Sequence, residues 1–341
     1  MRDMSGRQPK IVRRRAGPQR DREREIARAL ERVRQSCDVP ARLALDPVAV
    51  LHRYPRPQDR ELVGLIASAV AFGNVKALRA KLEDALLRLG PDVARVADDK
   101  DDVFARLSGW KHRVYRDEDL ARLLLGARRV QRQSGSLGNR FAADLERAAG
   151  DLRLALTSFT SAIRRAGRLA PKSGQARRGS AHILADPRGA SACKRLLLYL
   201  RWMVRPADGV DVGLWPIPTS ALLVPVDTHI HKLSRNLGFT KRKDLSWKTA
   251  EEVTAALRRF DPSDPTKYDF ALCHLGMLQR CPSRRDVVRC QGCGVLPICR
   301  HWTGAKGPAL PSEPPSSSGE PDVSDALGVG QSSMSIPRQT A

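Results

Sequence analysis

The chain has 341 residues, of which 41% are hydrophobic and only 5% aromatic, and its formal net charge of +23 gives an isoelectric point near 10.6. This length allows one large domain or two small ones, and a chain with few aromatics but many Leu, Ala and Arg residues favours helices over a β-sandwich. A field this positive attracts polyanions, nucleic acid above all, although a genome of high GC content that encodes arginine often would also raise the charge.

The two ends of the chain differ from its middle in composition. Residues 1–22 are rich in arginine and poor in apolar residues, which predicts a mobile basic arm, and helical spacing of apolar residues over Arg24–Arg34 predicts an edge helix. We take residues 1–36 as this arm and helix, 37–303 as the main region, and the Pro-, Ser- and Gly-rich stretch 304–341 as a disordered tail.

No part of the sequence resembles a targeting or membrane segment. The N-terminus lacks the apolar stretch of a signal peptide, and no apolar run approaches the length that spans a bilayer. We therefore expect a monomer without membrane association, located in the cytoplasm and associated with the nucleoid.

Helical patterns follow one another through the first half of the main region. An almost wholly apolar helix is predicted over Leu62–Phe72 and ends at Gly73-Asn74, and an amphipathic helix runs over Val75–Leu89 until Gly90-Pro91 closes it. Further helices are predicted over Leu120–Val130, Phe141–Ala149, Lys248–Phe260 and Lys267–Arg280.

One long segment between these helices contains no acidic residue. No Asp or Glu occurs between Asp151 and Asp186, and the second half of this segment, together with the residues up to Gly189, contains Gly, Ser and Pro, which predicts an exposed loop over Pro171–Gly189. That loop is either simply solvated or in contact with phosphates.

A strongly patterned helix is predicted over Ser191–Arg205. It has apolar residues on one face, whereas four basic residues suggest a phosphate-facing surface: Lys194, Arg195, Arg201 and Arg205. Pro206 ends it. Four aromatic residues could stack on a base, although a place in the core is the favoured interpretation for each: Trp110, Tyr115, Trp202 and Trp215.

The next helix is predicted to begin directly after Asp227 and to run towards Leu237. An Asp at this position can accept hydrogen bonds from the free backbone N–H groups of the first turn, so that capping alone would explain it. His229 and His231 fall on different faces of the helix, which disfavours a metal pair. We expect His229 and Lys232 to lie near a nucleic-acid-binding cleft.

Four cysteines gather in a short segment near the end of the main region. Cys290 and Cys293 form one close pair, and Cys281 and Cys299 stand singly on either side, whereas a zinc ribbon supplies two close pairs. In a reducing compartment such thiols indicate metal ligands rather than disulfides. The pattern favours a [4Fe-4S] cluster; zinc and four free thiols are the alternatives. Cys273 is assigned to the core.

Two of these motifs resemble a known family. The spacing of Cys290, Cys293 and Cys299 is similar to the cluster loop of endonuclease III-type DNA glycosylases, although the gap between Cys281 and Cys290 is two residues longer. The stretch 225–230 (PVDTHI) resembles the step that carries that family's catalytic aspartate. Three further stretches, 61–76, 194–215 and 264–276, resemble an uncharacterised bacterial family of the helix-hairpin-helix glycosylase superfamily, a likeness that covers about residues 40–302.

The resemblance implies a fold, a partner and a reaction. The fold would be all-α and two-lobed, with the cluster loop at 281–299, and the partner would be DNA. The activity would be base-excision repair, in which a damaged base is flipped out of the duplex and removed. Asp227 would stabilise positive charge on the sugar or activate the nucleophile, and the phosphate-binding residues would be Arg195, Arg201, Arg205, His229 and Lys232.

The sequence departs from that family at one important position. The family's hairpin, similar to LPGVGRKTA and carrying a lysine nucleophile, is missing or degenerate at Gly209–Gly213, and no lysine occurs between Lys194 and Lys232. The usual lyase chemistry is therefore disfavoured. Lys194 is the remaining candidate nucleophile, as in the archaeal 8-oxoguanine glycosylase branch, where the lysine also lies earlier. The alternatives are hydrolysis driven by Asp227 alone, or a non-catalytic DNA- or RNA-binding protein on the same scaffold.

Overall fold

The protein is built almost entirely from helices. The computed structural model describes residues 18–169 and 178–303, so that the predicted tail and most of the basic arm lie outside the described residues. The helices are α1 (Pro18–Gln35), α2 (Val39–Leu43), α3 (Pro57–Val70), α4 (Val75–Leu89), α5 (Val93–Val96), α6 (Lys100–Leu107), α7 (Asp117–Ser134), α8 (Leu137–Arg147), α9 (Leu152–Gly167), α10 (Arg178–Ile183), α11 (Lys194–Val204), α12 (Thr228–Leu237), α13 (Trp247–Arg258), α14 (Asp269–Leu278) and α15 (Val287–Cys290).

Short elements complete the fold. Three 3-10 helices cover Pro47–Arg53 (η1), Thr219–Ala221 (η2) and Leu296–Ile298 (η3), and strands β1 (Lys111–His112) and β2 (Tyr115–Arg116) form a two-residue antiparallel hairpin. The predicted all-α class is confirmed. Within residues 18–169 and 178–303, no helix combines the length and the apolarity needed to cross a lipid bilayer.

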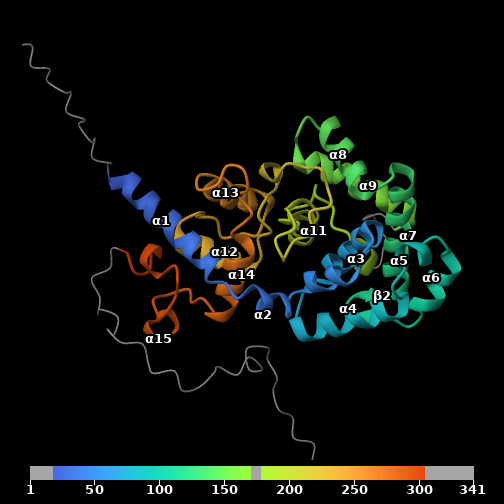
Figure 1. Ribbon diagram of the computed structural model, residues 1–341, viewed down its shortest axis with the longest axis horizontal. Helices are drawn as coiled ribbons and strands as arrows, with labels where there is room; N and C mark the ends of the chain where they lie inside the picture. The colour runs from blue at the N-terminus through green and yellow to red at the C-terminus, as the bar shows by residue number, and fades with distance from the viewer. Residues whose placement is uncertain (1–17, 170–177, 304–341) are drawn as a thin grey trace, which may run out of the picture.

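Two helices form the centre of the molecule. Figure 1 shows α3 and α11 between a group formed by α1 and α12–α15 and a group formed by α4–α9. Helix α3 packs against α11, and eleven of its fourteen residues are buried. Helix α11 is buried over Leu196–Val204. Because both are covered on all sides, their polar residues must find partners inside the protein.

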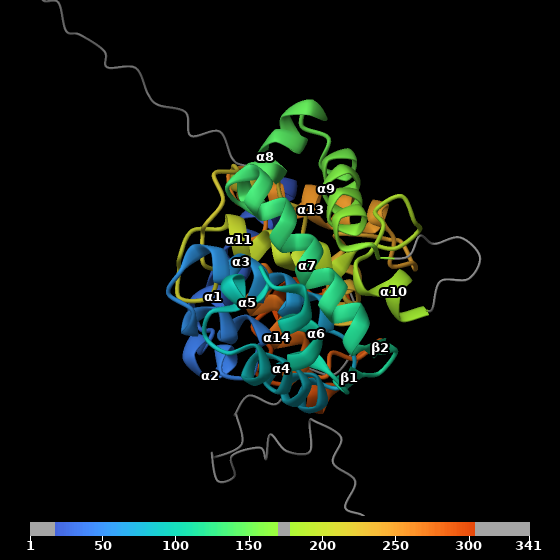
Figure 2. The same cartoon turned by 90° about the vertical axis from the view of Figure 1, so that its right-hand side faces the viewer.

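The group formed by α4–α9 depends on one close helix crossing, seen in Figure 2, where α7 and α9 lie side by side. Two glycines make this approach possible. A Cβ atom at Gly126 would lie 2.4 Å from the carbonyl oxygen of Ile163, and one at Gly167 would lie 2.2 Å from that of Arg122. The sequence patterns predicted α7 and α8 within a few residues but not α9.

Several predicted boundaries are confirmed by local capping. Helix α4 has the predicted bounds: the Asn74 side chain accepts a hydrogen bond from the backbone N–H of Ala77 at its start, and Gly90, with φ +79°, ends it. Helix α11 begins at Lys194 rather than Ser191, because Cys193 has a left-handed backbone with φ 51°.

The predicted loop over Pro171–Gly189 needs a correction. Residues 171–177 lie outside the described residues, but Arg178–Ile183 forms helix α10. Tertiary contacts explain this helix, because Ser180 is buried and its hydroxyl donates to the Asp119 side chain on α7 at 2.5 Å, while Ile183 is buried in the core. The four candidate stacking residues are also core residues, at most 4% exposed: Trp110, Tyr115, Trp202 and Trp215.

Candidate functional site

The structure brings the two predicted catalytic residues together. Lys194 is the first residue of α11 and Asp227 immediately precedes α12, and the Lys194 Nζ lies 4.0 Å from the Asp227 Oδ2. Their side chains are 32% and 20% exposed, so the pair lies at the surface but is partly shielded from water. An amine and a carboxylate from separate helices therefore meet where a ligand can reach them.

The two oxygens of Asp227 have different environments. Oδ1 accepts hydrogen bonds from the backbone N–H groups of His229 and Ile230, both at 2.9 Å, so the predicted N-cap is confirmed. Oδ2 faces Lys194 and accepts a hydrogen bond from the Cys273 thiol on α14, with an Sγ to Oδ2 distance of 3.6 Å. The cap fixes the carboxylate while its second oxygen stays available for chemistry.

Cys273 is a part of this site that sequence patterns assigned to the core. Burial and the carboxylates of Asp227 and Asp269 raise the pKa of its thiol well above its ordinary value. The thiol therefore stays protonated at neutral pH and can donate to Asp227. Nothing in the spacing around Cys273 indicates this contact, because α14 and α12 are brought together only by the fold.

A layer of buried charges lies beneath the pair. Arg201 on α11 is 2% exposed, its Nε lies 3.2 Å from Asp211 Oδ1, and it donates a short hydrogen bond to Asp269. Burial raises the pKa of the Asp269 carboxyl to about 6, and the nearby Asp227 carboxylate acts in the same direction, although Arg201 opposes them. The charge of Arg201 is thus committed to internal carboxylates.

Arg205 has a similar internal role. Its side chain is 9% exposed and its guanidinium group lies within 2.9 Å of three carboxylates, those of Asp208, Asp211 and Asp264. The prediction that Arg201 and Arg205 contact DNA is therefore corrected: both fall on a central helix whose surroundings are buried, and compensating carboxylates from distant segments hold them.

Arg195 is held differently. It is half-buried, and its guanidinium donates to the carbonyl oxygens of Ala69 at 2.7 Å and His182 at 2.5 Å. It lies 5.4 Å from the ring centroid of Phe72. These contacts tie α11 to the ends of α3 and α10. A role of Arg195 in DNA binding stays a prediction.

The other two predicted DNA contacts lie on α12. His229 is half-buried. A Cβ atom added at Gly276 of α14 would lie 3.3 Å from the Cβ atom of His229, so this histidine packs closely against α14. Lys232 is exposed to solvent. Among the predicted phosphate contacts, Lys232 is the one that the structure places fully on the surface.

The segment around Gly209–Gly213, where the family's hairpin was predicted to be missing or degenerate, lies between α11 and η2. Residues 206–218, between α11 and η2, contain no helix. They instead fold back on α11, where the backbone N–H groups of Val212 and Trp215 donate to the carbonyl oxygens of Trp202 and Met203, both at 2.9 Å. The sequence around Gly209 and Gly213 thus forms an extended return, and it provides no lysine near Asp227.

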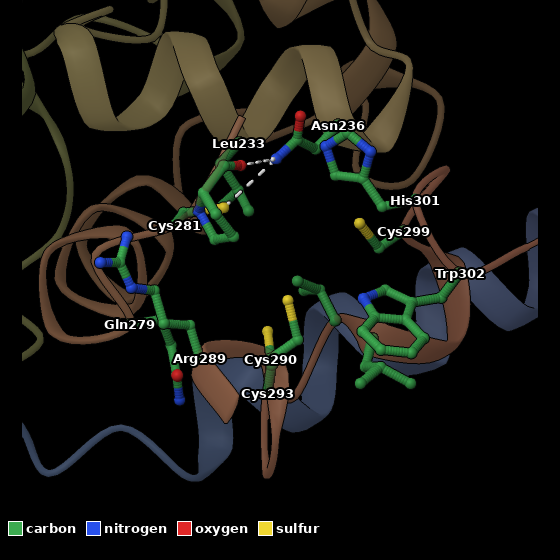
Figure 3. A pocket seen from close by; sticks show the side chains of 13 residues that line it. Leu233, Asn236, Gln279, Cys281, Arg289, Cys290, Cys293, Cys299, His301 and Trp302 are labelled. Carbon is green, nitrogen blue, oxygen red and sulfur yellow. Dashed lines mark hydrogen bonds between the residues drawn. The ribbon is translucent and has the colours of Figure 1, made fainter. Parts of the chain in front are cut away.

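The four C-terminal cysteines line one small cavity. Figure 3 shows their sulfur atoms pointing into this space from three sides. Cys281 follows α14, Cys290 ends α15, Cys293 follows a turn in which Gly292 has φ 69°, and Cys299 follows η3. As placed, no three His, Cys, Asp or Glu side chains in the described parts of the chain form a group that could hold a metal ion.

The chemistry of this cavity suits a soft ligand. Burial raises the pKa of the Cys281, Cys293 and Cys299 thiols, that of Cys293 to about 11, and the neighbouring thiols add to the effect for each. No Asp or Glu lines the cavity, and the Asn236 amide donates to Cys281 Sγ at 3.3 Å. Four thiols around a cavity without carboxylates are the donors that iron–sulfur clusters, zinc and copper(I) bind.

Comparison with known proteins identifies one family. A family model described as a protein of unknown function (DUF2400) matches residues 46–278, a range that contains Lys194, Asp227 and Cys273 and ends before Cys281. No curated protein and no solved structure matches the chain. Because the matched range spans more than half of the sequence, the chain belongs to the DUF2400 family of proteins of unknown function.

Proposed function

We propose that this protein is a DNA glycosylase-like enzyme of base-excision repair, which flips a damaged nucleotide out of the duplex and releases its base. The observation that carries the proposal is the approach of Lys194 Nζ to Asp227 Oδ2 at a partly exposed position. An amine beside a carboxylate is the pair that a covalent attack on the sugar carbon requires. The resemblance around residues 225–230 and the net charge of +23 support the choice of DNA as substrate.

Each residue of the pair has a role in the proposed reaction. The neutral amine of Lys194 attacks C1′ of the extruded nucleotide, the bond from C1′ to the base breaks, and its electron pair leaves with the base. Asp227 stabilises the positive charge that develops on the sugar, and its Oδ2 accepts the proton that the amine loses. Cys273 is a positioning residue, because its thiol holds the same oxygen.

Hydrolysis is the second route that this geometry supports. If Lys194 does not attack, Asp227 can activate a water molecule, and base release then proceeds without a covalent intermediate. In the lysine route, the C1′–O4′ bond of the adduct then opens and O4′ takes the proton held on Asp227 Oδ2, which leaves a protonated imine between Lys194 and C1′. Borohydride separates the two routes, because it reduces this imine to a stable adduct. A trapped adduct that Lys194→Gln abolishes supports the lysine, whereas base release without trapping supports hydrolysis.

The proposed function is tested on a panel of duplexes that contain oxidised purines, oxidised pyrimidines, alkylated bases or mismatches. Asp227→Asn is the decisive variant, since asparagine caps a helix about as well as aspartate, and the fold should survive. We expect this variant to bind DNA while its rate of base release falls about 100-fold or more. Equal rates in the variant and the natural protein would contradict the role of Asp227.

The rival function is binding without catalysis. It is favoured by the extended return at residues 206–218, where the related enzymes carry the hairpin and its lysine. A non-catalytic DNA- or RNA-binding protein would show a salt-sensitive gel shift but no base release from any duplex of the panel. That result would replace the enzyme with a binding protein on the same scaffold.

We further propose that Cys281, Cys290, Cys293 and Cys299 hold a [4Fe-4S] cluster. The support is that four thiols from separate segments line one shared cavity, which is the donor set that such a cluster takes. When bound, the cluster would supply a structural link between α14, α15 and η3. Brown protein with absorbance near about 400 nm and about four irons per chain is expected, whereas colourless protein with one zinc would refute it.

A further inference from the structure

A second, larger hollow runs along the outer side of α12. Its volume is about 570 Å³, and all the residues that line it are polar or charged. They are Thr228, His231, Lys232, Arg235, Asn236, Thr240, Lys241, Ser283, Arg300 and His301. We name this hollow the α12 groove. Its lining contains four permanent cations and two histidines but no Asp or Glu.

Among the described residues, the cations of the α12 groove have no acidic partners. Several arginines elsewhere in the protein do, as Arg128 pairs with Asp98 at 2.8 Å. Within the described parts of the chain, neither Lys232 nor Arg235 nor Lys241 forms a salt bridge. All three are exposed. Uncompensated positive charge that lines an open groove is complementary to a polyanion.

The fourth cation is fixed by backbone contacts from the cysteine loop. The backbone N–H of Arg300 donates to the carbonyl oxygen of Asn236 at 2.8 Å, and its side chain lies over Gly238 at the end of α12. A Cβ atom at Gly238 would lie 2.2 Å from the guanidinium group, so a glycine is needed there. The chain just after Cys299 thus forms one wall of the groove.

The position of the groove connects two features already described. At one end it includes Thr228, the residue next to Asp227, and at the other end His301, which also lines the cysteine cavity. A strand with one nucleotide facing Asp227 would therefore pass its neighbouring phosphates along α12. A single phosphate would fill little of such an open space, whereas a run of phosphates would meet several cations at once.

We propose that the α12 groove binds the phosphate backbone of DNA beside the extruded nucleotide. This inference rests on the proposed function for the choice of DNA, and it assigns to Lys232, Arg235, Lys241 and Arg300 the role that the buried Arg201 and Arg205 cannot fill. Phosphate contacts of this kind position the duplex without reading its sequence. They release counterions, so their number is measurable from the dependence of affinity on salt.

The test measures binding of an undamaged duplex of about 20 base pairs by fluorescence anisotropy between about 50 and 200 mM salt. Each phosphate contact contributes about 0.9 to the slope of log affinity against log salt. Lys232→Gln with Arg235→Gln should therefore reduce this slope by about 1.8. Lys241→Gln alone should reduce it by about 0.9.

A matched control uses two exposed cations of the α4–α9 group, Arg95 and Lys100, whose side chains are 74% and 66% exposed. The double variant Arg95→Gln with Lys100→Gln carries the same change in net charge as the groove variant. We expect its slope to equal that of the natural protein. Equal slopes in the groove and control variants would overturn the proposal, as would tighter, groove-dependent binding of single-stranded RNA of the same length.

This measurement is independent of base release, because the duplex contains no lesion. The groove variants could show a smaller slope of log affinity against log salt while the natural protein excises no base from the lesion panel. That result would support phosphate binding in the α12 groove and refute the glycosylase activity. Excision that depends on Asp227 with an unchanged slope would support the glycosylase and refute the groove.

Discussion

Replacement of Arg201 by methionine tests whether this arginine is an internal structural residue. Its side chain is 2% exposed, and its partners Asp211 and Asp269 are 0% and 4% exposed. Methionine retains much of the aliphatic volume, so the packing of α11 changes little. The substitution leaves the buried Asp269 without its cation and Asp211 with Arg205 alone, and that is the source of the expected loss.

Removing one member of a buried ion pair costs about 3–5 kcal/mol, a large part of the roughly 5–15 kcal/mol that stabilises a typical domain. With a denaturant slope of about 3 kcal/mol per molar urea, the midpoint of unfolding should fall by about 1–1.7 M. The measurement is urea unfolding followed by far-UV circular dichroism.

Two further variants make the result specific. Arg95→Met removes an arginine that is 74% exposed, with its Nε 3.8 Å from Asp92, and should change stability by less than about 0.5 kcal/mol. The double variant Arg201→Met with Asp269→Asn should be more stable than Arg201→Met alone, since one uncompensated carboxylate is gone. If Arg201→Met unfolds at the same urea concentration as Arg95→Met, the internal role of Arg201 is refuted.

Three other changes have defined outcomes. Because the folded-state pKa of Asp269 is raised to about 6, above its ordinary 3.8, this group makes the unfolding free energy fall as pH rises between about 4 and 6. In Asp269→Asn, the unfolding free energy should fall less steeply between about pH 4 and 6, by up to about 1.4 kcal/mol per pH unit. Urea midpoints that depend on pH in the same way in both proteins would contradict this. Gly238→Ala should destabilise the protein by about 1–3 kcal/mol, because φ is +79° and alanine is strained in that conformation; an unfolding free energy within about 0.5 kcal/mol of the natural protein would contradict the left-handed backbone at this residue. Cys290→Ala should abolish visible absorbance and iron content if the proposed cluster is present, whereas Cys273→Ala should leave both unchanged.

Much of the local structure followed from the sequence by itself. The all-α class followed from composition and helical spacing, and the bounds of α4 and α12 followed from residues that begin or end helices, such as Gly90 and Asp227. These signals are local, because a capping side chain or a glycine with positive φ acts on the backbone within a few residues. The grouping of four cysteines was also visible in the sequence.

Tertiary structure alone decided which charges face inward. A basic stripe on an amphipathic helix predicts a solvated face, but α11 lies at the centre, and Arg201 and Arg205 are held by carboxylates such as Asp264, which comes from a distant segment. The contact between Cys273 and Asp227 has the same origin. Sequence periodicity describes one helix at a time, whereas ion pairs and site geometry depend on how helices far apart in the chain pack together.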